Sequence, residues 1–335
     1  MYSYGLGDLA QNFLLQRRGA ALKTEMTRLN EELASGRISD VKSVLAGNVS
    51  YLSDIEGDLR TLSGYKVATS EAAQFASAAQ SALDRIDTGV ATLSTALITA
   101  SSSAVGPVLD QMSVDAKNEL SSIVTSLNTS SGGRSLFAGA ATDRPALNGA
   151  DTILADLRAA IAGNTTVDDI SAAVDAWFDD PAGFRASAYT GSDSALAAFQ
   201  LAEDEQVSVS LKADDTVFRT LMKNTALAAI AADDSLALSG PAQQSLLQQA
   251  GEGLFEAKAD LTAARSNLGS AEARIDTIAT RNAARDTSLQ FAKGALLQAD
   301  PYDTATQLEA VQFQLQSLYT ITARMSDLSL VNFVR

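Results

Sequence analysis

Residues 247–296 read LQQAGEGLFEAKADLTAARSNLGSAEARIDTIATRNAARDTSLQFAKGAL. Along them, mostly apolar side chains recur at alternating steps of three and four residues. The positions are Leu247, Ala250, Leu254, Ala257, Leu261, Ala264, Leu268, Ala271, Ile275, Ile278, Asn282, Arg285, Leu289, Ala292 and Leu296. This spacing places all of them on one stripe of an α-helix. At about 1.5 Å per residue, such a helix is roughly 75 Å long. The stretch therefore predicts a protein that builds extended structure, because a compact enzyme rarely contains such a rod.

The composition of the 335-residue chain excludes several classes of function. Its net charge of −15 argues against nucleic acid and anionic lipid as main partners, since both require a basic face. The chain contains neither Cys nor His, which excludes thiol chemistry, zinc–thiolate sites and imidazole catalysis. No stretch is apolar for long enough to span a membrane. Residues 1–18 lack the basic start and sustained apolar core of a secretory signal peptide, so we expect none.

Similar seams predict a mainly helical fold in which long helices form a coiled-coil bundle. We expect helices over about residues 3–34, 40–100, 107–129, 241–296 and 301–335, with prolines at or near several of the boundaries. Between the long helices, residues 132–217 show Gly, Asp and short apolar runs, which predicts a small inserted α+β domain. Within it we expect a strand at 207–211, weaker strands at 135–138 and 186–190, and helices at 151–162 and 167–178. Trp177 and Phe178 are expected in its core.

These boundaries predict five segments. They are an N-terminal assembly helix at 1–39, one half of the helical bundle at 40–131, an outward-facing insert at 132–217, the second half of the bundle at 218–300 and a C-terminal assembly helix at 301–335. Asn282 and Arg285 fall on the seam of the second half. Either the seam turns toward solvent there, or the two residues form a polar layer that sets the register of the helices.

The two terminal helices carry heptad seams, and each lacks an obvious partner except the other. Because an isolated pair of helices is marginally stable, we expect the termini to be mobile in the monomer and to order against neighbouring copies. The expected interface residues are Leu15, Leu22, Leu29, Leu33, Leu308, Val311, Leu315, Leu318, Met325 and Leu328.

No catalytic, metal or cofactor site is predicted. Paired aspartates at 168–169, 179–180, 214–215 and 233–234 lack the spacing of a calcium loop and are expected to form helix caps and turns. Residues 191–194, GSDS, lack the second glycine of a nucleophile elbow. A metal-dependent hydrolase built on the aspartate pairs is a minor alternative.

Three short motifs occur in an informative order: LASGRI at 33–38, GRSLFAG at 133–139, and ARSNLG at 264–269 followed by RID at 274–276. They resemble signatures of the bacterial flagellin family of axial proteins. The positions that carry the resemblance are Ser35, Gly36, Arg37, Gly133, Arg134, Phe137, Gly139, Arg265, Leu268, Gly269 and Arg274. The second motif and the ending LSLVNFVR at 328–335 are closest to the branch that joins the flagellar hook to the filament.

The resemblance implies a structural, non-enzymatic protein of the extracellular flagellum, exported without a cleaved signal peptide. The implied partners are copies of the chain in a ring, an adjacent hook-associated protein, filament flagellin, and a cytoplasmic export chaperone on the C-terminal helix. Filament flagellin is the close alternative for this chain, and a cytoplasmic coiled-coil scaffold is a more distant one.

Overall fold

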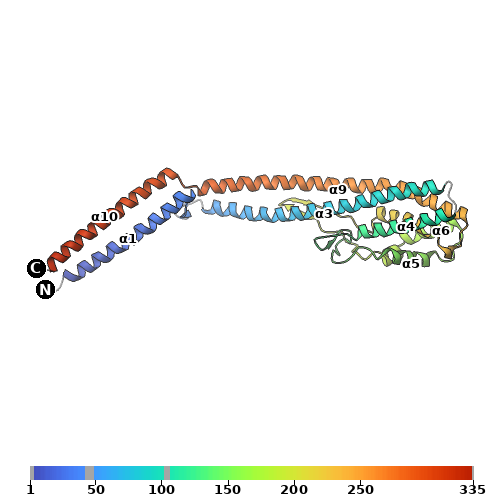
Figure 1. Cartoon of the computed structure of the whole chain (residues 1–335), viewed down its shortest axis with the longest axis horizontal. Coiled ribbons are helices and arrows are strands. Elements are labelled where there is room, and N and C mark those ends of the chain that lie inside the picture. The colour runs from blue at the N-terminus through green and yellow to red at the C-terminus, as the bar shows by residue number, and fades with distance from the viewer. Residues whose placement is uncertain (1–3, 42–48, 102–105, 334–335) are drawn as a thin grey trace. The chain divides into compact units, whose positions relative to one another are not determined.

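A computed structural model describes residues 4–41, 49–101 and 106–333, with side chains described for 10–41, 49–101 and 106–325. Contacts group the chain into two units (Figure 1). The terminal unit comprises Met1–Thr61 and Ala284–Arg335, and the central unit comprises Leu62–Ala283. The prediction of a mainly helical fold, with paired terminal helices and a small region of short strands, is confirmed. The five-segment division remains a prediction.

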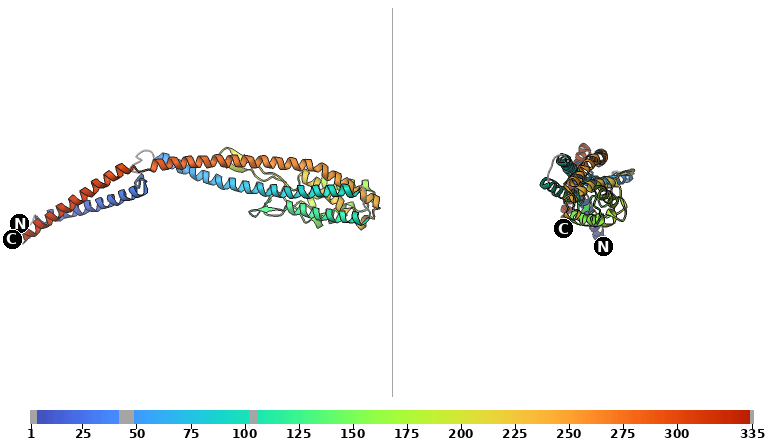
Figure 2. Two further views of the ribbon diagram at one scale, coloured as in Figure 1. Left: turned by 45° about the horizontal axis from the view of Figure 1, so that its top comes forward. Right: turned by 90° about the vertical axis from the view of Figure 1, so that its right-hand side faces the viewer.

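The terminal unit is built on a hairpin of two helices, α1 (Tyr4–Ser35) and α10 (Pro301–Phe333). Figures 1 and 2 show the two helices side by side. Leu29 packs against Leu308 and Val311, with Leu22 and Met26 beside them. The hairpin is antiparallel, because Leu29 in the second half of α1 meets the first half of α10.

The central unit is organised by α3 (Val49–Ser101) and α9 (Gly240–Leu297), both of which also contribute residues to the terminal unit. The hydroxyl of Ser94 donates a hydrogen bond of 2.8 Å to the carbonyl of Gly251. Glycine eases the close approach at this point, since a Cβ at Gly251 would lie 3.1 Å from that of Leu97. The predicted seam of α9 is buried or half-buried from Leu247 to Asn282. A third long helix, α4 (Gly106–Leu127), joins the same hydrophobic core through a seam that includes Leu109, Leu120 and Ile123.

Asn282 and Arg285 differ in their surroundings. The Asn282 side chain is buried, and its amide donates a 2.8 Å hydrogen bond to the Leu201 carbonyl. Arg285 is exposed and pairs with Asp58 at 3.2 Å. The expectation that both residues are solvated is therefore wrong for Asn282, because a strand carbonyl supplies the partner that its burial requires.

Short helices and two hairpins of very short strands lie between α4 and α9 in the chain. These elements are β1 (Ser130–Ser131), β2 (Arg134–Ser135), α5 (Ala150–Ile161), α6 (Val167–Asp179), α7 (Phe184–Ser187), β3 (Phe199–Ala202), β4 (Glu205–Val207), α8 (Thr216–Ile230) and a 3-10 turn, η1 (Asp234–Leu236). Strand β1 pairs antiparallel with β2, and β3 with β4. The helices predicted at 151–162 and 167–178 are confirmed. Trp177, Phe178 and Phe184 form an aromatic cluster in the core, as predicted for the first two.

The three predicted strands are wrong in extent. At 207–211 buried and exposed side chains alternate as expected. The pairing of β3 with β4 ends where Val207 pairs with Phe199, so the residues after Val207 have no partner strand in the described part of the chain. The strand predicted at 186–190 begins inside α7, and only Tyr189 forms an isolated bridge, with Leu147. The strand predicted at 135–138 includes Ser135 alone. Short apolar runs do not determine whether a partner strand is available.

Candidate assembly interface

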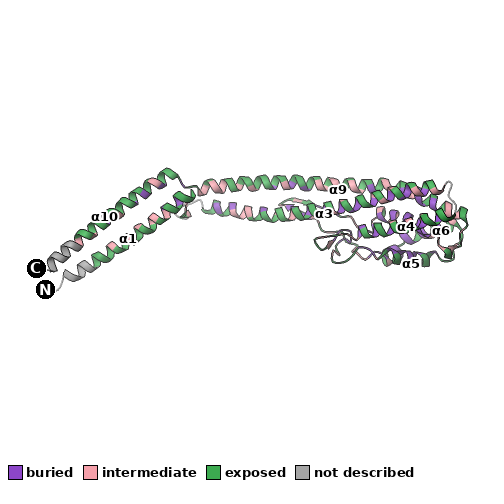
Figure 3. Cartoon of the chain, in the orientation of Figure 1, coloured by how far each residue is buried: buried purple, intermediate pink, exposed green. Residues whose placement is uncertain are grey.

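Large apolar side chains project from the terminal hairpin on the sides that its own pairing leaves uncovered. Phe13 and Leu14 on α1 are 65% and 61% exposed, and Phe313, Tyr319 and Ile321 on α10 are 71%, 51% and 51% exposed. Figure 3 shows that exposed residues dominate both helices. Scattered exposed apolar residues are normal on a surface, but aromatic residues exposed on both helices of one hairpin make it a candidate interaction surface.

The predicted interface residues lie mainly between the two helices of one chain. Leu29, Leu308, Val311 and Leu318 are buried there, and Leu15, Leu22, Leu315 and Met325 are half-buried, whereas Leu33 is exposed. Leu328 lies outside the residues whose side chains are described. A role for these residues between copies stays a prediction. The exposed residues that project from the hairpin, such as Phe13, were not predicted. Phe13 lies opposite Leu22 on a helical wheel, so a wheel of α1 could have identified it.

The middle of α10 is unusual in its lack of charge. Residues 310–323, AVQFQLQSLYTITA, contain no ionisable acid or base except the Tyr319 phenol. Most of these side chains are exposed in the single chain. When a neighbour covers a helix that is uncharged over four turns, no charged side chain loses its hydration. Covering it therefore costs less free energy than covering a charged helix.

The residues that follow α1 and the residues that precede α10 run beside each other and form a joint at the base of the hairpin. The Ile38 amide donates to the Leu297 carbonyl at 2.9 Å, and the Ala299 amide donates to the Gly36 carbonyl at 3.0 Å. Gly36 ends α1 with φ of +66°, a conformation that glycine adopts without strain. The motif residues Ser35, Gly36 and Arg37 therefore belong to the joint, where all three are exposed.

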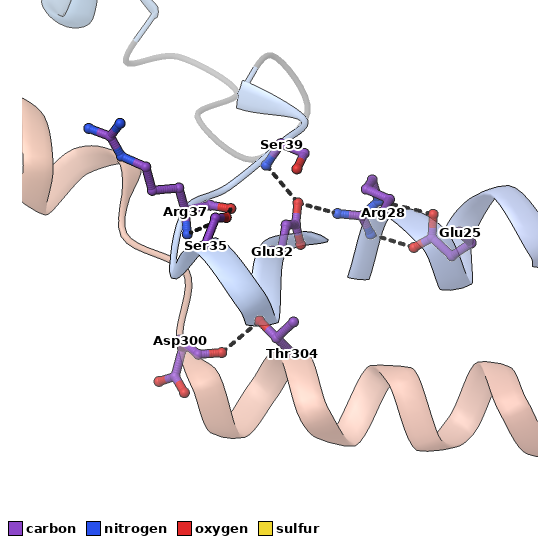
Figure 4. A network of polar contacts seen from close by, with 8 residues as sticks. All are labelled: Glu25, Arg28, Glu32, Ser35, Arg37, Ser39, Asp300 and Thr304. Atoms are coloured by element: carbon purple, nitrogen blue, oxygen red, sulfur yellow. Dashed lines mark hydrogen bonds and ion pairs between the residues drawn. The ribbon is translucent and has the colours of Figure 1, made fainter. Parts of the chain in front are cut away.

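Glu32 holds the first of these segments against α1 (Figure 4). Its buried carboxylate accepts a hydrogen bond of 2.8 Å from the Ser39 amide and one of 2.6 Å from Arg28. Arg28 also pairs with Glu25, and this hydrogen bond lowers the pKa of the Glu25 carboxyl. The carboxylates in turn raise the pKa of Arg28. On the other segment, the Asp300 carboxylate accepts from the Tyr302 amide at 2.8 Å and so caps α10.

Replacing Glu32 by alanine should loosen the joint without unfolding the central unit. The change removes the acceptor for the Ser39 amide, so we expect that amide to exchange with solvent roughly tenfold faster. Hydrogen exchange followed by mass spectrometry or NMR measures this rate. Glu31→Ala is the matched control, because Glu31 is the exposed neighbour of Glu32. Equal exchange rates at Ser39 in the two variants would show that Glu32 does not hold the joint.

The other motif residues form contacts inside the central unit. Arg134 pairs with Glu71 and lies over the Phe199 ring, and Phe137 packs edge-to-face on Phe218. Arg265 reaches Asp84 and Asp87 of α3, both at 2.7 Å. The remaining members are the buried Leu268, the exposed Gly133 and Arg274, the half-buried Gly269 and the buried Gly139. These motif residues are not gathered into one site.

The aspartate pairs form caps, turns and ion pairs. Asp169 lies in the first turn of α6, where Thr166 is the cap, and Asp233 caps η1 and pairs with Arg158. Asp214 is buried between Arg185, at 3.0 Å, and Lys212, at 3.4 Å. The part of the chain with described side chains contains no cluster of three acidic groups placed to hold a metal ion. Within the described helices, none has the length and apolarity needed to cross a membrane.

Comparison with protein-family models gives two matches that fit this architecture. Residues 10–142 match the bacterial flagellin N-terminal helical region, and residues 252–334 match the bacterial flagellin C-terminal helical region. The chain belongs to the bacterial flagellin family. Members of this family are structural rather than enzymatic, so the protein is a structural component of the flagellar axis, which lies outside the cell.

Solved structures show the same fold at low sequence identity. A Vibrio parahaemolyticus protein provisionally named a flagellar hook-associated protein is 16% identical, with a TM-score of 0.53, and the match covers 75% of this chain and 99% of that one. FlgL of Bacillus cereus is 12% identical, with a TM-score of 0.52, and the match covers 72% and 99%. No curated protein matches the chain at a significant level.

Proposed function

We propose that this flagellin-family protein joins the flagellar hook to the filament, and that its terminal hairpin is the element that assembles with neighbouring subunits. The projecting aromatic residues of the hairpin are the observation that supports assembly. A single chain pairs α1 with α10 along one seam only, so Phe13 on one helix and Phe313 on the other remain in water. Copies that pack side by side would remove both from solvent.

The junction role is supported by the sequence motif at residues 133–139 and by the two solved folds, one of which is named a hook-associated protein. On this proposal the chain forms a ring of identical subunits that contacts an adjacent hook-associated protein on one side and filament flagellin on the other. Before export, a cytoplasmic chaperone covers α10, whose seam at Leu308, Val311 and Leu318 suits binding of a helix in a groove. Export requires no cleaved signal peptide.

Filament flagellin is the second candidate, favoured by the family matches at both ends of the chain. Deletion of the gene separates the two functions. Loss of a junction protein should leave hooks without attached filaments and release flagellin into the medium. The junction proposal fails if filaments themselves are built from this chain.

Serine replacements at Phe13 and Phe313 test the hairpin. Both side chains are exposed, so the double variant should keep the helical content of the monomer. Buried interface aromatics commonly contribute more than about 1 kcal/mol each, so we expect incorporation into flagella to fall at least about tenfold. Immunoblotting of isolated flagella measures incorporation, and motility of the complemented deletion strain supports it.

Phe255→Ser is the matched control, because Phe255 is an equally exposed aromatic residue on α9 in the central unit. It should assemble like the unchanged protein. If the Phe13 and Phe313 variant also assembles normally, the hairpin is not the assembly element.

A further inference from the structure

The terminal hairpin is electrically polarised along its length. Residues 10–24 of α1 and 310–325 of α10 lie toward the tip of the hairpin and contain no acidic residue. They carry four exposed cations, which are Arg17, Arg18, Lys23 and Arg324. Lys23 lies 5.9 Å from the centre of the Tyr319 ring, which places the two stretches beside each other. In sequence, residues 1–9 add Asp8 and residues 326–335 add Asp327 and Arg335, so the two terminal stretches, 1–24 and 310–335, together keep a positive net charge.

The end of the hairpin next to the joint has the opposite charge. Residues 25–37 and 300–309 contain six carboxylates and two arginines, a net charge of −4. Arg28 is already paired with Glu25 and Glu32. The exposed carboxylates are those of Glu31, Asp300, Asp303 and Glu309. The hairpin therefore presents a basic tip and an acidic base.

This hairpin also differs from the rest of the protein in net charge. The terminal unit carries 11 basic and 13 acidic residues, a net charge of −2, whereas the central unit carries 14 and 27, a net charge of −13. Copies of the central unit repel one another, whereas copies of the hairpin can come close. Close packing in register would still set like charges against each other, which is costly when they are desolvated.

We propose that neighbouring hairpins pack in the same direction but displaced along their length, so that the basic tip of one copy lies against the acidic base of the next. The inference rests on the proposed assembly role of the hairpin and identifies the second copy as the partner of this surface. Charge complementarity selects the displacement, and the projecting aromatic residues supply the apolar contact.

The spacing of charges gives the size of the displacement. Arg17 and Glu31 are 14 residues apart on α1, close to four helical turns, and therefore share a face. Arg324 and Glu309 are 15 residues apart on α10 and also lie on nearby faces. At about 1.5 Å per residue, a single displacement of roughly 20 Å brings each of these cations level with its carboxylate in the next copy.

Charge exchange tests the arrangement. Arg17→Glu with Arg324→Glu places carboxylates at the two matched positions of the tip, and Glu31→Lys with Glu309→Lys places cations at the two matched positions of the base. We expect each double variant to incorporate into flagella roughly tenfold less than the unchanged protein. The chain with all four changes restores opposite charges and should recover incorporation. Coexpression of the two double variants should do the same. Lys66→Glu with Asp276→Lys, two exposed sites in the central unit, is the control and should assemble normally.

Cysteine cross-linking measures the displacement directly, since the chain contains no other cysteine. In flagella built from the variant Arg17→Cys with Glu31→Cys, a short thiol-specific reagent should join position 17 of one copy to position 31 of another. Peptide mapping identifies the joined positions. Cross-links between two copies of position 17, or normal incorporation of both double charge variants, would overturn the displaced packing. The aromatic variants test the assembly role separately, so that role stands if only the charge tests fail.

Discussion

Replacing Gly139 by alanine should destabilise the central unit by about 3–5 kcal/mol, because strain and a backbone clash combine there. Gly139 has φ of +60°, in the left-handed region that costs other residues about 1 kcal/mol. A Cβ at this position would also lie 2.5 Å from the Ser194 carbonyl oxygen and 2.7 Å from that of Ser192. Both oxygens belong to backbone, and both segments are tied to the turn. The Ala140 amide donates to the Ser194 carbonyl, and the Ser192 amide donates to the Ala138 carbonyl.

Urea unfolding followed by the fluorescence of Trp177, the only tryptophan, measures this loss. Gly133→Ala is the matched control, since Gly133 has φ of +78° but open space around the position of a Cβ. It should cost only about 1 kcal/mol. Equal losses in the two variants would mean that the close carbonyl oxygens contribute nothing.

Glu119 should make the stability of the central unit fall as the pH rises from about 4.5 to about 7. Its carboxyl lies on α4 against Gly89 of α3, and Oε1 has no hydrogen-bond partner among the described residues. Burial raises the pKa of Glu119 from 4.5 to about 7. Between these values the folded protein holds a proton that the unfolded chain releases, so raising the pH favours unfolding. Above pH 7 the loss is complete and amounts to about 2 kcal/mol after allowance for partial exposure.

Glu119→Gln keeps the shape of the side chain and removes the ionisation. The variant should be more stable than the unchanged protein at pH 8 by about 2 kcal/mol and should lose this part of the pH dependence. Thermal unfolding at a series of pH values between 4 and about 8 measures both effects. Asp110→Asn, at an exposed acid on the same helix, should leave the pH dependence as it is. If Glu119→Gln has no effect on the slope between pH 4.5 and about 7, the carboxyl is not buried in solution as described.

The long helices could be predicted to within a few residues because each buries one stripe, and a stripe leaves a period in the sequence. The exception is the start of the helix predicted at 40–100: α3 begins at Val49, and residues 42–48 lie outside the described part of the chain. Helix α8 could not be recognised as a separate helix for the opposite reason. Its side chains from Ala226 to Ile230 are all buried, so no contrast between two faces remains to be detected. The short strands failed because a strand requires a partner that is distant in sequence. The alternation at 207–211 indicates that this segment has one buried and one exposed face. It does not indicate that the pairing with β3 ends at Phe199.

The role of the predicted interface residues between copies stays a prediction. Heptad spacing predicted that Leu29, Leu308 and Leu318 lie on apolar seams. The structure shows that the two helices of one chain bury these residues against each other. Intramolecular and intermolecular seams have the same period, so spacing alone cannot assign them. The proposed contact between copies therefore rests on the exposed residues Phe13 and Phe313, which lie off the seam, and on the distribution of charge along the hairpin.

The paired backbone hydrogen bonds at the joint have a mechanical consequence. Because the Ile38 amide is bonded to the Leu297 carbonyl and the Ala299 amide to the Gly36 carbonyl, residues 36–38 and 297–299 cannot rotate separately without breaking these hydrogen bonds. The two segments are linked to each other as well as to the helices that they extend. A twisting force that reaches one of these segments is therefore passed to the other through the two hydrogen bonds.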